Sequence, residues 1–237
     1  MALLPVTWVE GWPIIGSAGS DGIGNMVWAG KKPIAGGPVV VPQRDDEFEG
    51  KVLAPQWEWN YQARVEKWSL TERPGFLRLH AFVPLKAGDL LKAGNTLTQR
   101  AFRTESSEVT VKLDLSGMVD GQEAGLCHLA RAWSTIGILQ KGDVRTLTFN
   151  EGGKVTAGEV IASSTVWLRS TWGFDGVSQY AYSVDGKTFT AFGPPYRLTW
   201  SYYRGDRLGI YSYNNKGDGG FVDVDWFHYE VGKPGAK

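Results

Sequence analysis

The chain has 237 residues, with 31 Gly, 11 Pro and 11 Trp, and its 25 basic residues balance its 25 acidic ones. Hydrophobic residues make up 42% of the chain, which together with the zero formal net charge excludes intrinsic disorder and leaves no basic excess for nucleic-acid binding. A single cysteine, Cys127, excludes an internal disulfide and a zinc finger.

The first ten residues do not predict a secretory signal peptide, because they have no basic start and are interrupted by Pro5 and Glu10. No apolar run approaches the roughly 18 residues of a membrane span. We therefore expect a soluble protein with neither a membrane nor a nucleic-acid partner. Secreted and cytoplasmic locations both stay open.

Residues 1–44 differ in composition from the rest of the chain. Glycine-rich stretches at 16–24 and 36–38 leave one predicted strand, Leu3–Val9. Three Trp residues also lie here (Trp8, Trp12 and Trp28), and Trp is unusual on a free loop. We expect this segment to pack along another surface rather than to form an independent domain.

From residue 45 onward, alternating apolar and polar residues predict antiparallel strands separated by turns such as Asp120-Gly121 and Asp185-Gly186. A short helical turn is predicted only at Leu85–Ala93. The number of strands exceeds one comfortable open sheet, so residues 45–237 are predicted to form an all-β, two-sheet antiparallel β-sandwich. The predicted strands are 76–82, 95–102, 108–115, 124–129, 135–139, 144–149, 165–172, 178–183, 207–213 and 222–229.

Acidic residues lie at both ends of the predicted sandwich. Asp45-Asp46-Glu47 opens it, and Asp223-Val-Asp225 lies in its last strand. Because first and last strands of a sandwich often neighbour one another, these carboxylates could meet and supply the oxygen ligands that Ca²⁺ takes. The alternative is a pair of solvated strand ends. The three His residues are scattered, which argues against zinc.

No catalytic pattern is convincing in this sequence. Asp223, Asp225 and Glu230 faintly resemble the carboxylate strand of sandwich glucanases, but alternation places Glu230 on the face opposite the two Asp residues. No Gly-x-Ser-x-Gly nucleophile elbow and no phosphate-binding loop is present.

Aromatic residues are the stronger signal, because Trp and Tyr can stack on the apolar face of a sugar ring. If Val166 and Leu168 face the core, Trp167 and Arg169 face outward, whereas strict alternation turns Trp172 inward unless the strand ends early. Other aromatics fall in predicted loops or turns, and four Trp residues are interpreted as core. The candidate ligand-binding residues are Trp133, Trp167, Arg169, Trp172, Trp200, Tyr202 and Tyr203; the predicted core residues are Trp57, Trp59, Trp68 and Trp226.

Several strings together resemble one family, and they run in order along nearly the whole chain. The stretch 4–13 is similar to the end of the five-bladed propeller of glycoside hydrolase family 43. The later strings resemble the concanavalin A-like jelly-roll module that follows this propeller in β-xylosidases and arabinofuranosidases, classed as carbohydrate-binding module family 91. These strings are DDEF at 45–48, QWEWN at 56–60, WSLTERPGFLRL at 68–79, NTLTQR at 95–100, TVKLDLSGM at 110–118, YSVDG at 182–186 and DVDWF at 223–227.

The resemblance implies that the catalytic carboxylates belong to a propeller, so that residues 1–44 would be a propeller remnant plus linker and residues 45–237 the module. It also implies binding of xylan or xylo-oligosaccharides, or packing on the propeller to shape its active site. A structural Ca²⁺ held by Asp46 and Asp225 is implied as well. The segment 127–135 departs from the expected residues, which weakens a ligand role for Trp133.

Three functions follow from these observations. The first is a non-catalytic, xylan-binding module that serves a family 43 enzyme. The second is a structural module that only supports the propeller. The third, a β-xylosidase or arabinofuranosidase in its own right, lacks a catalytic pattern.

Overall fold

The computed structural model describes residues 4–25, 36, 43–200 and 205–232. The chain divides into two compact units, Met1–Pro42 and Gln43–Lys237, each of which is described by itself.

The first unit contains more regular structure than the sequence predicts. Instead of one strand it has two small hairpins, because Glu10 and Gly11 both adopt positive φ and form a two-residue turn of the kind that joins antiparallel strands. The two Trp residues that the structure describes in this unit, Trp8 and Trp12, are highly exposed, and Trp12 exposes 74% of its surface. The strands are β1 (Val6–Val9), β2 (Trp12–Ile15), β3 (Ser17–Ala18) and β4 (Gly24–Asn25).

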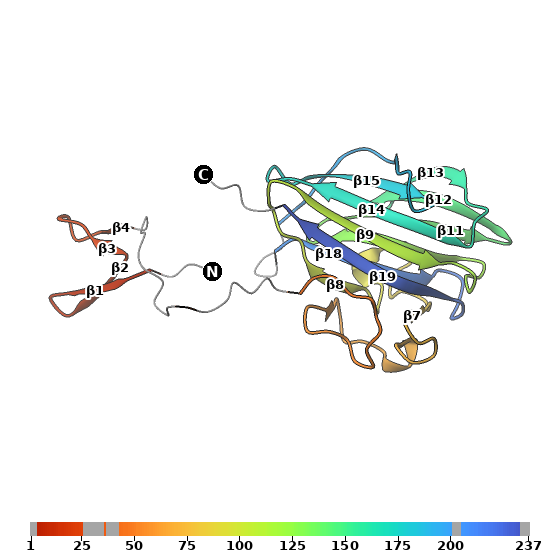
Figure 1. The fold of residues 1–237 in the computed structure, drawn as a ribbon, viewed down its shortest axis with the longest axis horizontal. Coiled ribbons are helices and arrows are strands. Elements are labelled where there is room, and N and C mark those ends of the chain that lie inside the picture. Colours follow the sequence, from red (N-terminus) through yellow and green to blue (C-terminus); the bar gives the residue numbers. More distant parts are fainter. Residues whose placement is uncertain (1–3, 26–35, 37–42, 201–204, 233–237) are drawn as a thin grey trace. The chain divides into compact units, whose positions relative to one another are not determined.

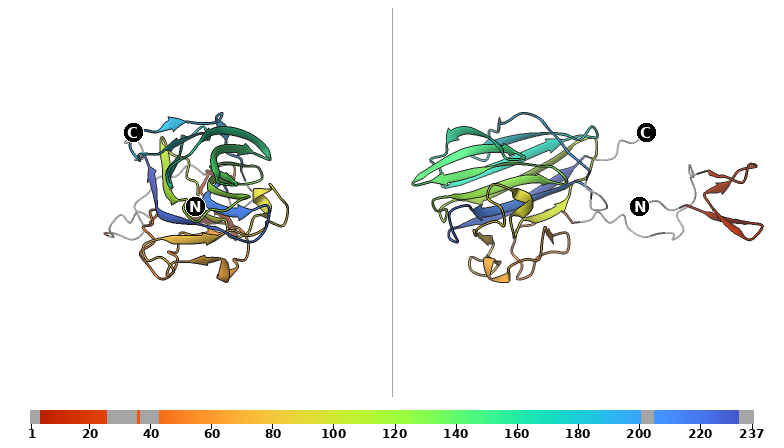
Figure 2. Two further views of the ribbon diagram at one scale, coloured as in Figure 1. Left: turned by 90° about the vertical axis from the view of Figure 1, so that its right-hand side faces the viewer. Right: turned by 180° about the vertical axis from the view of Figure 1, so that it is seen from behind.

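The second unit is a sandwich of two antiparallel sheets (Figures 1 and 2), which confirms the predicted fold class. One sheet has seven strands in the order β13-β12-β11-β10-β18-β8-β5. Their bounds are β13 (Lys154–Val160), β12 (Val144–Glu151), β11 (Trp133–Lys141), β10 (Gln122–Leu129), β18 (Arg207–Asn214), β8 (Leu97–Arg100) and β5 (Glu58–Trp59).

The other sheet has eight strands in the order β16-β15-β14-β9-β19-β7-β6, with β17 paired to β15. Two 3₁₀ turns, η1 (Val65–Lys67) and η2 (Leu90–Lys92), complete the described part of this unit, and η2 lies inside the predicted helical turn. The strands are β16 (Thr190–Ala191), β15 (Val177–Ser183), β14 (Thr165–Trp172), β9 (Ser107–Asp114), β19 (Phe221–Val231), β7 (Leu77–His80), β6 (Trp68–Ser69) and β17 (Tyr196–Arg197).

Side chains from the inner faces of both sheets form the main core. The alternation along β9 and β14 places Val109, Val111, Val166 and Leu168 inside with no exposed surface, as the sequence pattern predicts. Close packing of these branched side chains leaves the residues between them on the outer face of the eight-stranded sheet.

A second apolar cluster covers the outer face of the seven-stranded sheet. Leu90 and Ala93, from the β7–β8 connection, pack on Cys127, Tyr211 and other side chains of β10, β11 and β18. The glycines of this face leave room for the packing, since a Cβ at Gly137 would meet the Tyr211 hydroxyl. This part of the face is therefore filled by the chain itself and offers no sugar groove.

Strand β19 contains a β-bulge. Val224 pairs with Leu113 and Trp226 with Lys112, so Asp225 has no opposite residue on β9. The extra residue turns Trp226 to the outer face, although the sequence analysis placed it in the core; that prediction was wrong. The predicted core positions of Trp57, which is buried, and of Trp59 and Trp68, which are half-buried against the core, are confirmed.

Candidate functional site

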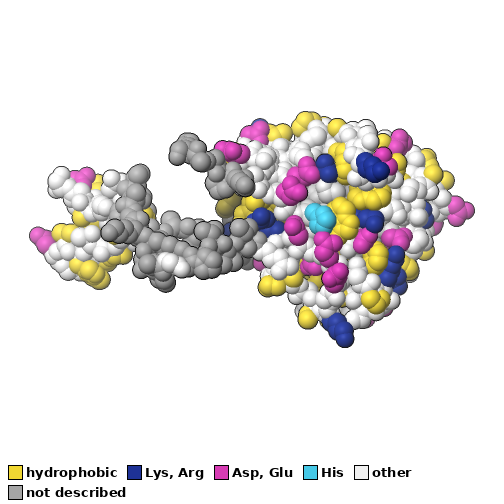
Figure 3. Space-filling view, in the orientation of Figure 1, with side chains coloured by type: hydrophobic (Ala, Val, Ile, Leu, Met, Phe, Trp, Pro, Cys, Tyr) yellow, Lys and Arg dark blue, Asp and Glu magenta, His cyan; other side chains and the backbone are white. Residues whose placement is uncertain are grey.

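The outer face of the eight-stranded sheet carries three cross-strand rows of mixed polar and aromatic residues. β14, β9 and β19 each contribute one residue to a row, because the side chains that alternate away from the core align across neighbouring strands. Figure 3 shows this face of the molecule, with acidic, basic and hydrophobic side chains interspersed. The rows are Trp167–Lys112–Trp226, Arg169–Thr110–His228 and Thr171–Glu108–Glu230.

Trp226 and His228 form an aromatic stack on this face, with ring centroids 4.0 Å apart and planes within 14°. His228 Nε2 lies 2.6 Å from Glu47 Oε1, so the segment before the sandwich fixes the imidazole ring. The alternation after the bulge brings the two rings to the same side of β19. The stack is a half-exposed, flat surface of the kind that a sugar ring can cover.

Trp167 lies across β9 from Trp226, in the same row. The Lys112 ammonium is 5.6 Å from the centre of the Trp167 ring, and the turn at Gly186 packs against the indole edge. Gly186 has a positive φ of 71°, and a Cβ there would lie 2.8 Å from the indole, so a larger residue would displace the ring. These contacts hold Trp167 half-buried and orient its ring on the face.

Arg169 is held by three neighbours. Its Nε is 3.0 Å from Thr110 Oγ1 and 3.1 Å from Glu108 Oε1, and its guanidinium stacks on Phe189 at 3.6 Å from the ring centre. A guanidinium with a carboxylate partner and an aromatic support is pre-organised to donate its remaining hydrogen bonds in a fixed direction. Arg169 is therefore suited to bind hydroxyl oxygens above the sheet.

These residues line two adjacent depressions. The smaller one, of about 110 Å³, is bounded by Trp167, Trp226, Arg169 and their neighbours. The larger one, of about 850 Å³, runs to the end of the sheet where β14 turns into β15 at Phe174. Both are lined by Glu108 and Glu230, so the two depressions adjoin, and we call them together the sheet-face groove.

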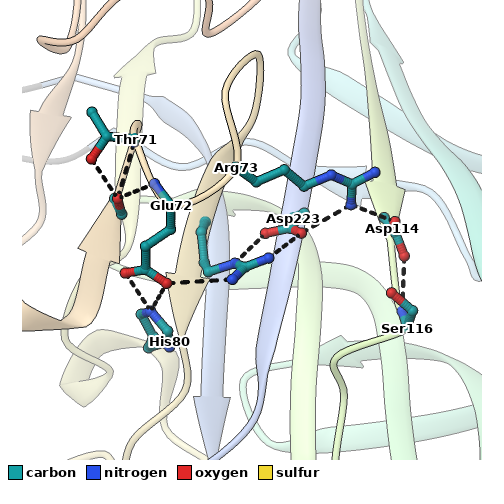
Figure 4. A network of polar contacts seen from close by, with 9 residues as sticks. Thr71, Glu72, Arg73, His80, Asp114, Ser116 and Asp223 are labelled. Carbon is teal, nitrogen blue, oxygen red and sulfur yellow. Dashed lines mark hydrogen bonds and ion pairs between the residues drawn. The ribbon is translucent and has the colours of Figure 1, made fainter.

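An ion-pair network centred on the buried Asp223 lies on the same outer face of the sheet (Figure 4). Asp223, almost fully buried, accepts hydrogen bonds from Arg78 Nε at 2.7 Å and Nη2 at 2.8 Å, and from Arg73 Nη1 at 3.0 Å. The hydrogen bond with Asp223 raises the pKa of Arg78. Burial would raise the pKa of Asp114, but hydrogen bonds from Arg73 and Ser116 lower it.

This network and the bulge correct two points about the carboxylates of β19. The bulge places Glu230 on the same face as Asp223, not on the opposite face as strict alternation predicts. The Asp223 carboxylate is nevertheless committed to two arginines, which removes it from acid–base chemistry.

Of the predicted ligand-binding residues, the structure brings only Trp167 and Arg169 together. Trp133 and Trp172 expose 5% and 3% of their surface, because one packs under η2 and the other in the main core. Neither can offer a ring face to a ligand, and the prediction for these two is corrected. Trp200 exposes 67% of its surface at one end of the sandwich. Tyr202 and Tyr203 lie outside the described residues.

The Asp46 and Asp225 carboxylates each have partners of their own in this structure. The predicted approach of the first segment to the last strand is confirmed, since Asp46 bridges to Phe227. However, the Asp46 carboxylate accepts hydrogen bonds from the Phe48 backbone and from Trp57 Nε1, and Asp225 pairs with Lys112. In the part of the chain that the structure describes, no three His, Cys, Asp or Glu residues group in a way that could hold a metal. Calcium therefore stays a prediction that the present partners of both carboxylates do not favour.

Two further titratable groups are buried between or behind the sheets and are unavailable for chemistry. His128 donates or accepts at Ser170 Oγ, 2.8 Å away, and desolvation lowers its pKa to about 3. Burial raises the pKa of the Cys127 thiol, which keeps it protonated and unreactive.

Residues 45–230 match the family model of the β-xylosidase C-terminal concanavalin A-like domain. The chain belongs to this family. The membership agrees with the two-sheet sandwich and with the resemblance found in the sequence. In glycoside hydrolase family 43 enzymes this domain is the C-terminal part, and the catalytic domain lies elsewhere.

Relatives place the domain in longer proteins. A β-xylosidase of Formosa agariphila is 39% identical over 255 aligned residues, covering 99% of this chain and 43% of the relative. A putative β-xylosidase of Escherichia coli is 28% identical, with 95% and 45% coverage. The chain thus spans less than half the length of these curated relatives.

Solved structures share the fold. A bifunctional GH43-CE protein of Bacteroides eggerthii superposes with a TM-score of 0.82 at 26% identity, over 98% of this chain and 31% of that one. A GH43 protein of Bacillus licheniformis gives 0.77 at 21% identity, with 97% and 46% coverage, which shows the fold alone.

No helix among the described residues has the length and apolar character that crossing a membrane requires.

Proposed function

We propose that this C-terminal domain is a non-catalytic module that binds xylan or xylo-oligosaccharides along the sheet-face groove and serves a family 43 enzyme. The observation that carries the proposal is the convergence of Trp167, Arg169 and the Trp226–His228 stack on one depression. Aromatic faces supply stacking, and the fixed guanidinium and neighbouring carboxylates supply hydrogen bonds to hydroxyls.

The groove suits a short oligosaccharide rather than a single sugar. From Trp167 to Thr171 along β14, five residues span about 13 Å. The groove continues past them to Phe174, which is exposed. An open groove of this kind offers only a few rings and few buried polar contacts. We therefore expect micromolar to millimolar affinity, which becomes effective when the module is tethered to an enzyme.

Titration calorimetry of the whole chain with xylohexaose tests this proposal. Trp226→Ala and Trp167→Ala should each weaken binding by about tenfold, the loss expected for one stacking contact. Trp12→Ala is the matched control, because Trp12 is an exposed Trp of the first unit, outside the groove. Binding that is absent in the parent chain, or that persists unchanged in both groove variants, would contradict the proposal.

A second function is favoured by a different observation, at the end of the sandwich where the chain enters. Phe102 and Trp200 are exposed there, and Arg103 joins their two loops through Asp206 and the Leu198 carbonyl. Gln99 Nε2 donates to the Arg44 carbonyl, which ties the entering segment to the same end. We infer that this end docks on the propeller domain that precedes the module in the family.

Docking and sugar binding are separable by experiment. A family 43 propeller produced without its C-terminal domain should associate with this chain in analytical ultracentrifugation, and Trp200→Ala should weaken the association. Trp226→Ala serves as the control and should leave it unchanged. A failure to associate, or equal effects of the two variants, would count against docking at this end.

A further inference from the structure

Carboxylates outnumber cationic side chains in the lining of the sheet-face groove. Among the described residues that line it, four carry carboxylates, Glu105, Glu108, Asp175 and Glu230, whereas one, Arg169, carries a guanidinium. Arg169 is paired with Glu108, so its charge is offset locally. The remaining carboxylates give the groove an excess of negative charge at neutral pH.

The position of Glu230 is unfavourable for the sheet itself. It lies directly opposite Glu108 on β9, and like charges at opposite positions of an antiparallel pair destabilise the sheet. Both side chains line the junction of the two depressions, where a bound chain would pass. The negative charge of Glu230 therefore acts on any ligand that spans the groove.

From this charge distribution we infer that the groove selects neutral oligosaccharides and rejects chains that bear uronic-acid substituents. The inference rests on the proposed function and adds a substrate class to it. Glu230 is the specificity-determining residue, because the charge of Glu108 is offset by Arg169. The hydroxyls of a neutral sugar can donate to the groove carboxylates, whereas a ligand carboxylate is repelled by them. The two cations that it would meet near the tryptophans, Arg169 and Lys112, are each already paired with a carboxylate.

The test compares two probes, xylohexaose and a xylo-oligosaccharide that carries one glucuronic acid. At low ionic strength the whole chain should bind the neutral probe at least about tenfold more tightly than the acidic one. Raising the salt to about 0.5 M should reduce the difference in affinity between the two probes, because the salt screens the repulsion between carboxylates. The affinity for the neutral probe should stay nearly constant.

Glu230→Gln should strengthen binding of the acidic probe roughly threefold at low salt, because one repulsive charge is removed. Glu66→Gln is the control, because it makes the same charge change at an exposed residue of η1 that does not line the groove. It should leave the difference in affinity between the two probes unchanged.

Three results would overturn the inference. These are equal affinity for the two probes at low salt, tighter binding of the acidic probe, and an equal effect of Glu66→Gln and Glu230→Gln. Each leaves the proposed function standing if xylohexaose binds. Binding of neither probe would contradict the proposed function itself, and the selectivity with it.

Discussion

Arg78 and Asp223 form a two-point ion pair across strands β7 and β19, with Nε and Nη2 of the arginine donating to the two oxygens of one almost fully buried carboxylate. Arg73 adds a third hydrogen bond and connects the pair to Asp114. The loop at 69–76 is thereby fixed to three strands of the eight-stranded sheet.

The charge of Asp223 should be essential for stability. Asp223→Asn keeps the shape of the side chain but leaves Arg78 and Arg73 without their central partner, so we expect a loss of about 3 kcal/mol in the free energy of unfolding. Asp218→Asn, at an exposed pair with Lys67, is the control and should cost less than about 1 kcal/mol. Urea denaturation at pH 7 measures both, and similar small losses would contradict the role of the network.

Stability should fall on mild acidification because of His128. Its pKa is about 3 in the folded state and about 6.5 when unfolded, so between these values the unfolded state binds the proton and is favoured as the pH falls. This proton linkage should lower the free energy of unfolding by about 2 kcal/mol at pH 5 relative to pH 8. Urea denaturation at both pH values measures it.

His128→Phe removes this titration. At pH 8 the variant should be less stable than the parent, because the hydrogen bond with Ser170 is lost. Its free energy of unfolding should nevertheless change less between pH 8 and pH 5 than that of the parent. A His128→Phe protein with the full parental slope would show that other groups cause it.

The second unit should fold without the first. The described core residues of the sandwich all lie at or beyond Phe48, so no core residue is removed with residues 1–42. We expect residues 43–237 to unfold in one cooperative transition, with a Tm within about 3 °C of the full chain, which corresponds to less than about 1 kcal/mol. Differential scanning calorimetry measures the Tm and the width of the transition for both chains. A broad transition, or a strongly lowered Tm, would mean that the first unit stabilises the sandwich.

Chelation should leave the sandwich unchanged. Since the Asp46 and Asp225 carboxylates already have hydrogen-bond and ion-pair partners, we expect EDTA and CaCl₂ to shift the Tm by less than about 1 °C. A fall of the Tm with EDTA in the parent chain would support the calcium site that the sequence suggests.

The sequence predicts most of the sandwich because strands such as β14 alternate strictly between buried and half-exposed residues. Along β14, two-residue alternation correctly predicts that Val166 and Leu168 face the core. It also predicts the outward positions of Trp167 and Arg169 and the inward position of Trp172. The exposed edge strand β13 is missed, because Lys154–Val160 has no buried face to produce a hydrophobic pattern.

The candidate site is predicted only in part, for reasons that local patterns do not contain. Trp133 looks like a loop residue, yet it is covered by η2, which is more than 40 residues away in the sequence. Trp226 and Glu230 are assigned to the wrong faces because strict alternation treats Asp225 as an ordinary strand position. Asp225 has no partner on β9, so the residues after it face the opposite way. No glycine or other local signal marks that residue.

Asp225 also determines how β19 tolerates changes in length. Removing it would leave every other pairing between β19 and β9 in place, so a chain shortened by that one residue should keep the same face toward solvent. Removing a residue further along, such as His228, would invert the remainder of the strand and bury Glu230. The eleven-residue strand therefore has one position at which a single-residue deletion is expected to be silent.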